Sequence, residues 1–298
     1  MISMETKELY LDFGKEKTYC RILPSASKKT PLLFLHGGPG SGHDSFELLD
    51  DLREKDDRTL IFYDQLGCGR STARHIDPAK IDMELWIKEL ENVIQKLSLS
   101  SVHLLGHSFG GMLLQEFLLQ KRPKEVRKAI FSSTLSSSRL WEKETKRLLR
   151  FLSLEDQKAI EEAEKTKKYD GGGFEKAMKD YALRYIGREA DEKAPECLRR
   201  EKNPQAKVVY LANWGPSEFL PTGRLKNFDT TKRLKEITIP ILLLSGEEDE
   251  STPLINKMIY DNLQCEKKWV LLPKARHRTY DDQREKYEES VMGFLKED

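Results

Sequence analysis

The stretch GHSFG at residues 106–110 places Ser108 between two glycines, after a largely apolar run at 102–105 and before an apolar segment at 111–119. This order predicts a buried strand, a sharp turn and a helix, with the serine at the apex of the turn. Glycines are expected on either side because a Cβ at those positions would collide with the neighbouring strand or helix. A turn serine can also simply cap the following helix, but the strand and helix around this one favour a catalytic nucleophile.

A serine nucleophile needs a base and an acid, and in α/β-hydrolases the chain order is nucleophile, acid, histidine. The apolar run at 239–246 ends in a glycine, as a buried parallel strand often does, and an acidic loop follows it. Within that loop Asp249 is the predicted acid, with Glu247 or Glu248 as alternatives. The segment therefore predicts a second catalytic residue at the carboxyl end of a strand.

A further predicted strand at 268–272 is followed by His277 and then by an amphipathic last helix. An imidazole can take the proton of a serine near neutral pH and return it to the leaving group, and a carboxylate fixes the tautomer of the imidazole. We therefore predict a Ser108–His277–Asp249 triad that works through an acyl-enzyme intermediate.

Another glycine-rich stretch, HGGPG at 36–40, follows a short apolar strand at 32–35. Small residues allow backbone N–H groups to approach a reacting carbonyl, so we assign the amides of Gly38 and Phe109 to the oxyanion hole and Gly37 to the substrate-binding surface. A phosphate-binding loop is the alternative, but the stretch has neither a GxGxxG pattern nor a lysine at Walker spacing.

Together with the serine turn, HGGPG at 36–40 and YDQLGCGRS at 63–71 resemble the proline iminopeptidase family of serine aminopeptidases, within the α/β-hydrolase fold. Within that family the sequence is most similar to the archaeal, tricorn-interacting branch. The segments NWGPSEF at 213–219 and GEEDESTP at 246–253 also resemble parts of the family, so the similarity extends along essentially the whole chain.

The resemblance implies an activity, its substrates and further site residues. It implies release of an N-terminal proline, or another small apolar residue, from short peptides with a free N-terminus, which an upstream protease would supply. It also implies that Glu218 and Glu250 bind the α-ammonium group of the peptide. Trp214, in the predicted cap, is assigned to the substrate-binding site as a residue that could line the pocket. The chain departs from the family at His107, where glycine or serine is more usual, and at Trp214, where a smaller or polar residue is expected.

Two other functions stay open at this stage. An esterase, lactonase or amidase acting on a small non-peptide acyl compound would use the same triad. A ligand-sensing protein could keep the triad mainly to bind its signal. Glu218 and Glu250 discriminate between the first alternative and an aminopeptidase, because a substrate without an ammonium group gives no reason to place acids in the pocket.

The spacing of the predicted strands indicates one insertion in an otherwise regular α/β core. An opening antiparallel pair is predicted before residue 24, and the strands near 127–132 and 239–244 are separated by a long segment with helical periodicity. We expect a core at 1–135 and 231–298, with a helical cap at 136–230 that covers the carboxyl ends of the strands.

Composition excludes several other classes of protein. Lys plus Arg is 51 against 50 for Asp plus Glu, so the net charge of +1 gives no electrostatic reason to expect nucleic acid binding. No segment approaches about 18 consecutive apolar residues, so no membrane association is expected. The first residues, MISME, lack the basic and apolar regions of a signal peptide, and we expect a cytoplasmic location.

The cysteines and histidines give no sign of a metal or cofactor site. The four cysteines have no CxxC spacing and the six histidines form no HExxH, so we expect free thiols, no catalytic metal and no cofactor.

Overall fold

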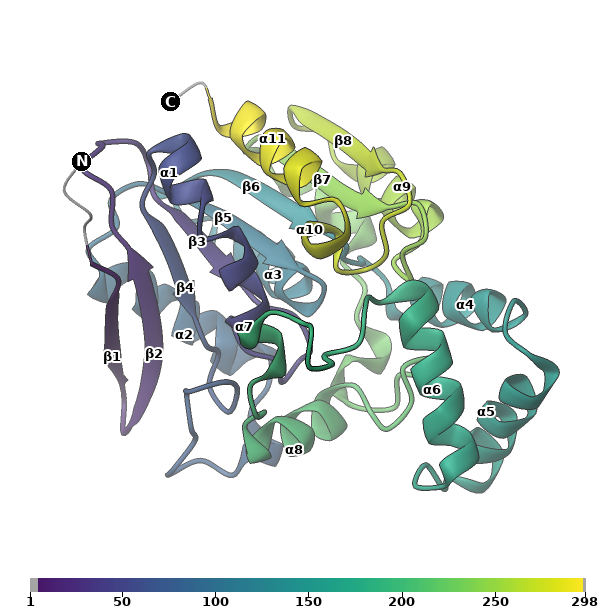
Figure 1. Ribbon diagram of the computed structural model, residues 1–298. Coiled ribbons are helices and arrows are strands. Elements are labelled where there is room, and N and C mark those ends of the chain that lie inside the picture. The colour runs from purple at the N-terminus through teal and green to yellow at the C-terminus, as the bar shows by residue number, and fades with distance from the viewer. Residues whose placement is uncertain (1–4, 297–298) are drawn as a thin grey trace.

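The computed structural model describes residues 5–296, so the first four residues, on which part of the targeting prediction depends, lie outside it. An eight-stranded sheet in the order β1-β2-β4-β3-β5-β6-β7-β8 forms the centre of the molecule (Figure 1). The predicted opening pair is confirmed: β1 and β2 are antiparallel, as are β2 and β4, and every later pairing is parallel. The strands are β1 (Lys7–Phe13), β2 (Glu16–Leu23), β3 (Leu32–Leu35), β4 (Leu60–Tyr63), β5 (Val102–His107), β6 (Val126–Ser132), β7 (Ile241–Gly246) and β8 (Lys267–Leu272).

Helices cover both faces of this sheet (Figure 1). One face packs against α2 (Met83–Lys96), α3 (Phe109–Lys121) and α9 (Pro253–Asn262), and the other against α1 (Leu52–Asp56) and α11 (Arg284–Leu295). The central strands are short and apolar throughout because successive side chains alternate between two buried faces. In β3, for example, Leu33 and Leu35 enter one hydrophobic cluster while Leu32 and Phe34 enter the other. This architecture is the α/β-hydrolase fold that the sequence predicts.

The segment between β6 and β7 is helical, and most of it lies beyond the carboxyl ends of the strands (Figure 1). Its first three helices share a small hydrophobic core in which Ile160, Tyr181 and Phe219 are buried. The cap helices are α4 (Ser138–Leu149), α5 (Leu154–Thr166), α6 (Gly172–Tyr185), α7 (Glu196–Arg199) and α8 (Pro204–Asn213), followed by the 3-10 helix η3 (Arg224–Asn227).

The two ends of this segment meet. Ser137 forms a β-bridge with Asp229, and the Thr230 N–H donates a hydrogen bond of 2.9 Å to the Ser136 carbonyl. These contacts support the division that we propose, in which a cap at 136–230 is inserted into a core formed by 1–135 and 231–298. Within residues 5–296, no helix is both long enough and apolar enough to cross a membrane. The four cysteines are free.

Candidate active site

Ser108 lies in the sharp turn between β5 and α3, as the sequence predicts. Its φ of 54° and ψ of −120° are strained values for a residue with a side chain. The turn is held from β6 and the residues after it: the Ser108 N–H donates to the Ser132 carbonyl at 2.9 Å, and the Thr134 hydroxyl donates to the Ser108 carbonyl at 2.7 Å. Because Ser108 remains partly exposed in this turn, its hydroxyl can meet a substrate.

The glycines of the motif allow the turn to pack closely against the sheet. A Cβ on Gly106 would lie 2.4 Å from the Gly110 carbonyl oxygen, and a Cβ on Gly110 would lie 2.1 Å from the Leu35 carbonyl oxygen. Neither contact is sterically allowed, and backbone atoms cannot give way as a flexible side chain can. The glycine spacing is therefore a packing requirement of the elbow.

The structure brings His277 against Asp249 rather than against the alternative acids. The His277 Nδ1 is 2.7 Å from the Asp249 Oδ1, and both residues are buried, whereas Glu247 and Glu248 are exposed. The Asp249 carboxylate also accepts the Ser251 N–H at 2.7 Å and the Gly246 N–H at 3.4 Å. With Nδ1–H donating to Asp249, Nε2 of the neutral ring is left as the proton acceptor that a general base needs.

The predicted oxyanion loop lies against the elbow. A Cβ on Gly37 would be 3.1 Å from the Ser108 Cβ, and Gly38 has a φ of +115°, which side-chain-bearing residues rarely adopt. The preceding His36 is fixed by Gln65, whose backbone N–H donates to the His36 Nε2 and whose side-chain amide donates to the His36 carbonyl, each at 3.0 Å. Burial lowers the pKa of His36, so its ring is neutral and Nε2 can accept.

The YDQLGCGRS segment supports this loop, a role that the sequence did not predict. Its buried Asp64 accepts the backbone N–H groups of His43 and Arg70, each at 2.7 Å. The same carboxylate accepts the His43 Nδ1 at 2.8 Å. One carboxylate therefore joins the end of the glycine-rich loop to the turn after β4. No sequence signal beyond the family resemblance indicates the pairing of Asp64 with His43, because the two residues are 21 positions apart on different loops.

Glu218 from the cap and Glu250 from the core both lie near the triad. Glu250 is buried, with its Oε1 3.8 Å from the His277 Nε2, and its Oε2 makes no hydrogen bond within the described residues. Burial raises the pKa of Glu250 well above its ordinary value, and the negative charges of Glu218 and Asp249 raise it further. Burial also raises the pKa of Glu218, although a hydrogen bond from Tyr210 and the charge on His277 act in the opposite direction.

Aromatic residues of the cap contact these acids. Of these residues, the sequence analysis assigned only Trp214 to the site. The Tyr210 hydroxyl donates to the Glu218 Oε2 at 2.6 Å, and Tyr181 interacts electrostatically with Glu250. The indole N–H groups of Trp141 and Trp214 both donate to the Glu218 carbonyl, at 3.1 and 3.4 Å. Trp214 therefore contacts the backbone of Glu218 directly. The two tyrosines come from different cap helices, so no local motif reveals them.

His107, the departure inside the serine motif, is a packing residue in this structure. Its ring lies 4.8 Å from the His277 ring and meets Tyr280 edge-on at 5.2 Å. Burial lowers the pKa of His107 well below its ordinary value, and the charges on His277 and Arg278 act in the same direction. A neutral imidazole therefore fills the space beside the base.

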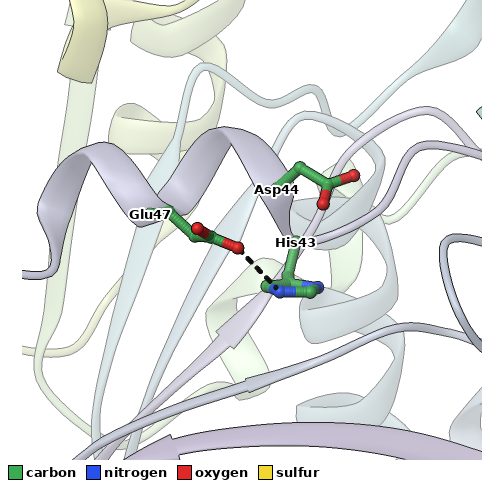
Figure 2. A group of neighbouring side chains, drawn as sticks. All are labelled: His43, Asp44 and Glu47. Carbon is green, nitrogen blue, oxygen red and sulfur yellow. Dashed lines mark ion pairs between the residues drawn. The ribbon is translucent and has the colours of Figure 1, made fainter. Parts of the chain in front are cut away.

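One group among residues 5–296 has the composition of a metal site, and it lies outside the triad. His43, Asp44 and Glu47 offer ligand atoms within 4.8 Å of one another, and Figure 2 shows Glu47 turned towards the His43 ring. However, Arg200 of the cap donates to Asp44 and to Glu47, each at 3.0 Å. The guanidinium thus places a positive charge against both carboxylates, and the group joins the cap to the core.

Comparison with known proteins agrees with this geometry. The family model described as alpha/beta hydrolase fold matches residues 30–283. The chain is 41% identical over 294 residues to the proline iminopeptidase of Lactobacillus delbrueckii subsp. lactis, covering 98% of this chain and 99% of the relative. It is also 41% identical over 293 residues to the proline iminopeptidase of Clostridioides difficile (strain 630), with 98% and 99% covered.

Solved structures extend the similarity to the whole architecture. The crystal structure of the proline iminopeptidase of Mycobacterium smegmatis superposes with a TM-score of 0.86 at 26% identity, covering 97% of this chain and 98% of that one. The crystal structure of VinJ superposes with a TM-score of 0.89 at 27% identity and the same coverage. The predicted closeness to the archaeal branch stays a prediction. The chain belongs to the proline iminopeptidase family of α/β-hydrolases.

Proposed function

We propose that this protein is a serine aminopeptidase that releases an N-terminal proline, or another small apolar residue, from short peptides with a free N-terminus. The observation that carries the proposal is a pair of acids near His277, of which Glu250 is buried and Glu218 half-buried. Membership of the family agrees with it, since the relatives at 41% identity are named proline iminopeptidases.

The proposed reaction follows from the residues at the elbow. Ser108 attacks the carbonyl carbon of the first peptide bond while His277 takes its proton, and Asp249 stabilises the imidazolium that forms. The backbone N–H groups of Gly38 and Phe109 bind the developing oxyanion. His277 then protonates the departing amine, and water hydrolyses the acyl-enzyme by the same steps in reverse order.

The two glutamates provide recognition of the substrate's N-terminus. An ammonium group loses its hydration when it enters a closed pocket, and this loss must be offset by ionised acceptors. Glu250 has an oxygen without a hydrogen-bond partner in the described residues, and Glu218 has its backbone fixed by two indoles. The ammonium would bring the positive charge that this pair of acids lacks. We assign Gly37 and Trp214 to the walls of the same site.

A substrate panel tests the proposal. We would compare prolyl- and alanyl-7-amido-4-methylcoumarin with their N-acetylated forms and with p-nitrophenyl acetate. A charge-assisted hydrogen bond contributes about 1.5–3 kcal/mol, so acetylation should lower kcat/KM by at least roughly 10-fold. Equal rates on free and acetylated forms would contradict ammonium recognition. Activity confined to the ester would favour an esterase, and no turnover on any compound would favour a ligand-sensing protein.

The biological setting belongs to the same proposal. An enzyme that removes single residues from short peptides depends on an upstream protease to supply them. We place this activity in the cytoplasm, with no cofactor and no nucleic acid partner.

A further inference from the structure

The end of the cap helix α6 contacts the loop that carries His277. The His277 backbone N–H donates to the Tyr185 carbonyl at 2.8 Å, and the Arg278 N–H donates to the Ile186 carbonyl at 2.9 Å. Carbonyls in the last turn of a helix have no donor within the helix. The loop of the proposed base thus satisfies the end of a cap helix.

Arginine side chains extend this contact on both sides of the histidine. Arg276 donates through Nη1 to the Leu183 carbonyl at 2.7 Å, and Arg278 donates through Nη2 to the Arg188 carbonyl. Positive charges at a helix C-terminus are stabilising because the unpaired carbonyls carry partial negative charge. The two arginines that flank His277 in the sequence are therefore used to hold the cap.

The cap also contributes a side chain to this contact, which forms one ion pair with the core. Arg188 binds Asp281 with two hydrogen bonds, Nη2 to Oδ1 at 2.6 Å and Nε to Oδ2 at 3.1 Å. Arg278 also lies across Gly187, where a Cβ would be 2.4 Å from the Arg278 Nε. Each segment thus fits against the backbone of the other, and neither can shift alone without breaking several hydrogen bonds.

We propose that the backbone carbonyls of Tyr185 and Ile186, together with the Arg188 side chain, position the general base. This inference rests on the proposed role of His277 in catalysis. Asp249 holds the imidazole at Nδ1, while the cap holds the backbone of the same residue through the Tyr185 carbonyl. Displacing α6 would leave the His277 N–H without its acceptor and free the loop to move. Arg188 and Arg278 are positioning residues in this scheme, acting through His277.

The test uses Arg188→Gln, Arg278→Gln and their double variant, with Arg184→Gln as the matched control. Arg184 lies on the same helix end, with its guanidinium over the Tyr185 ring at 5.6 Å, so the control removes the same charge. Rates would be measured on p-nitrophenyl acetate and on prolyl-7-amido-4-methylcoumarin, and normalised by titrating Ser108 with a fluorophosphonate. Amide hydrogen exchange of the 276–281 segment would be followed in parallel.

We expect the double variant to lose about 10-fold in kcat on both substrates, with KM nearly unchanged, because misplacement by ~1 Å can cost up to about 10²-fold. Exchange at 276–281 should rise, each single variant should show a smaller effect, and Arg184→Gln should match the wild type.

Other outcomes would separate the two proposals. Faster exchange with unchanged kcat would mean that the contact joins the cap to the core without positioning the base. Unchanged exchange would mean that other contacts hold the loop, and either result overturns this inference alone. If the double variant does not fold, the same rates and hydrogen exchange are measured on the two single variants. His277→Ala is the reference: if it keeps full activity, the assignment of the base fails instead.

Discussion

Two neighbouring carboxylates, one facing the core and one facing the cap, differ in how fully the protein satisfies their hydrogen bonding. Asp249 accepts two backbone N–H groups as well as His277, so the protein itself satisfies it. Glu250, the next residue, is equally buried, yet one of its oxygens has no hydrogen-bond partner in the described residues and its pKa is raised. The difference separates the proposed catalytic region, whose acid is satisfied by the protein itself, from the proposed recognition region, which lacks positive charge.

The strongest test of the catalytic region is to remove the nucleophile or the base. Ser108→Ala and His277→Ala should each lower kcat by roughly 10⁴-fold or more, because the members of such a triad act as one unit. Both substrate types should be affected equally, measured as initial rates on the coumarin amide and on the ester. The double variant should be little worse than either single one. Losses that add together would contradict a shared mechanism.

Asp249→Asn tests whether the satisfied acid has the role assigned to it. The amide can donate to Nδ1 and so favour the wrong imidazole tautomer, and we expect a loss approaching ~10⁴-fold in kcat. The measurement is kcat on both substrates, with Glu248→Gln, an exposed acid of the same loop, as the control. An active Asp249→Asn beside an inactive Glu248→Gln would show that the acid is misassigned.

The recognition region should respond selectively. Glu218→Gln or Glu250→Gln removes an ionised acceptor, so kcat/KM on free N-terminal substrates should fall by roughly 10- to 100-fold while ester hydrolysis is largely retained. The ratio of the two activities is the quantity to measure. Equal losses on both substrates would mean that the glutamates only support the structure of the site.

The smallest expected effect is on stability, and its sign follows from the raised pKa of Glu250. An acid whose pKa is higher in the folded state gives its full contribution below its ordinary pKa, 4.5 for Glu250, and loses it as pH rises towards the folded value. Glu250→Gln should therefore be more stable than the wild type at pH 7 and similar to it near pH 4. Differential scanning fluorimetry should show a gain of a few degrees, since ~1 kcal/mol moves Tm by about 2–4 °C in domains of 150–250 residues. A variant that is less stable at pH 7 would contradict the idea that the unliganded carboxylate is costly.

The placement of the proposed catalytic residues can be predicted from the sequence because it follows from strand order. Ser108, Asp249 and His277 each follow a parallel strand, and the carboxyl ends of parallel strands meet at one edge of the sheet. A motif with correct spacing therefore already implies proximity. Glu250 lies at the same edge because it is the residue after Asp249 in the chain.

The cap is less predictable because its residues meet only through tertiary packing. Helical periodicity marks the insertion but gives no information on the direction of each helix. The sequence therefore does not indicate that Tyr181 and Tyr210 lie at the site, and only the family resemblance assigns Glu218 to it. The sequence around Arg276 and Arg278 does not indicate their partners, because the helix end that accepts their hydrogen bonds is about 90 residues away in the chain.

The contact between Arg200 and the His43 group has a consequence for exchanging caps between relatives. Burial alone would lower the pKa of His43, but its hydrogen bonds to Asp64 and Glu47 raise that pKa to about 9, so the ring is cationic at neutral pH. A grafted cap without an arginine at this position would remove the guanidinium that pairs with both Asp44 and Glu47. Chimeric enzymes built for new substrates should therefore inherit Arg200 and Glu47 as a unit.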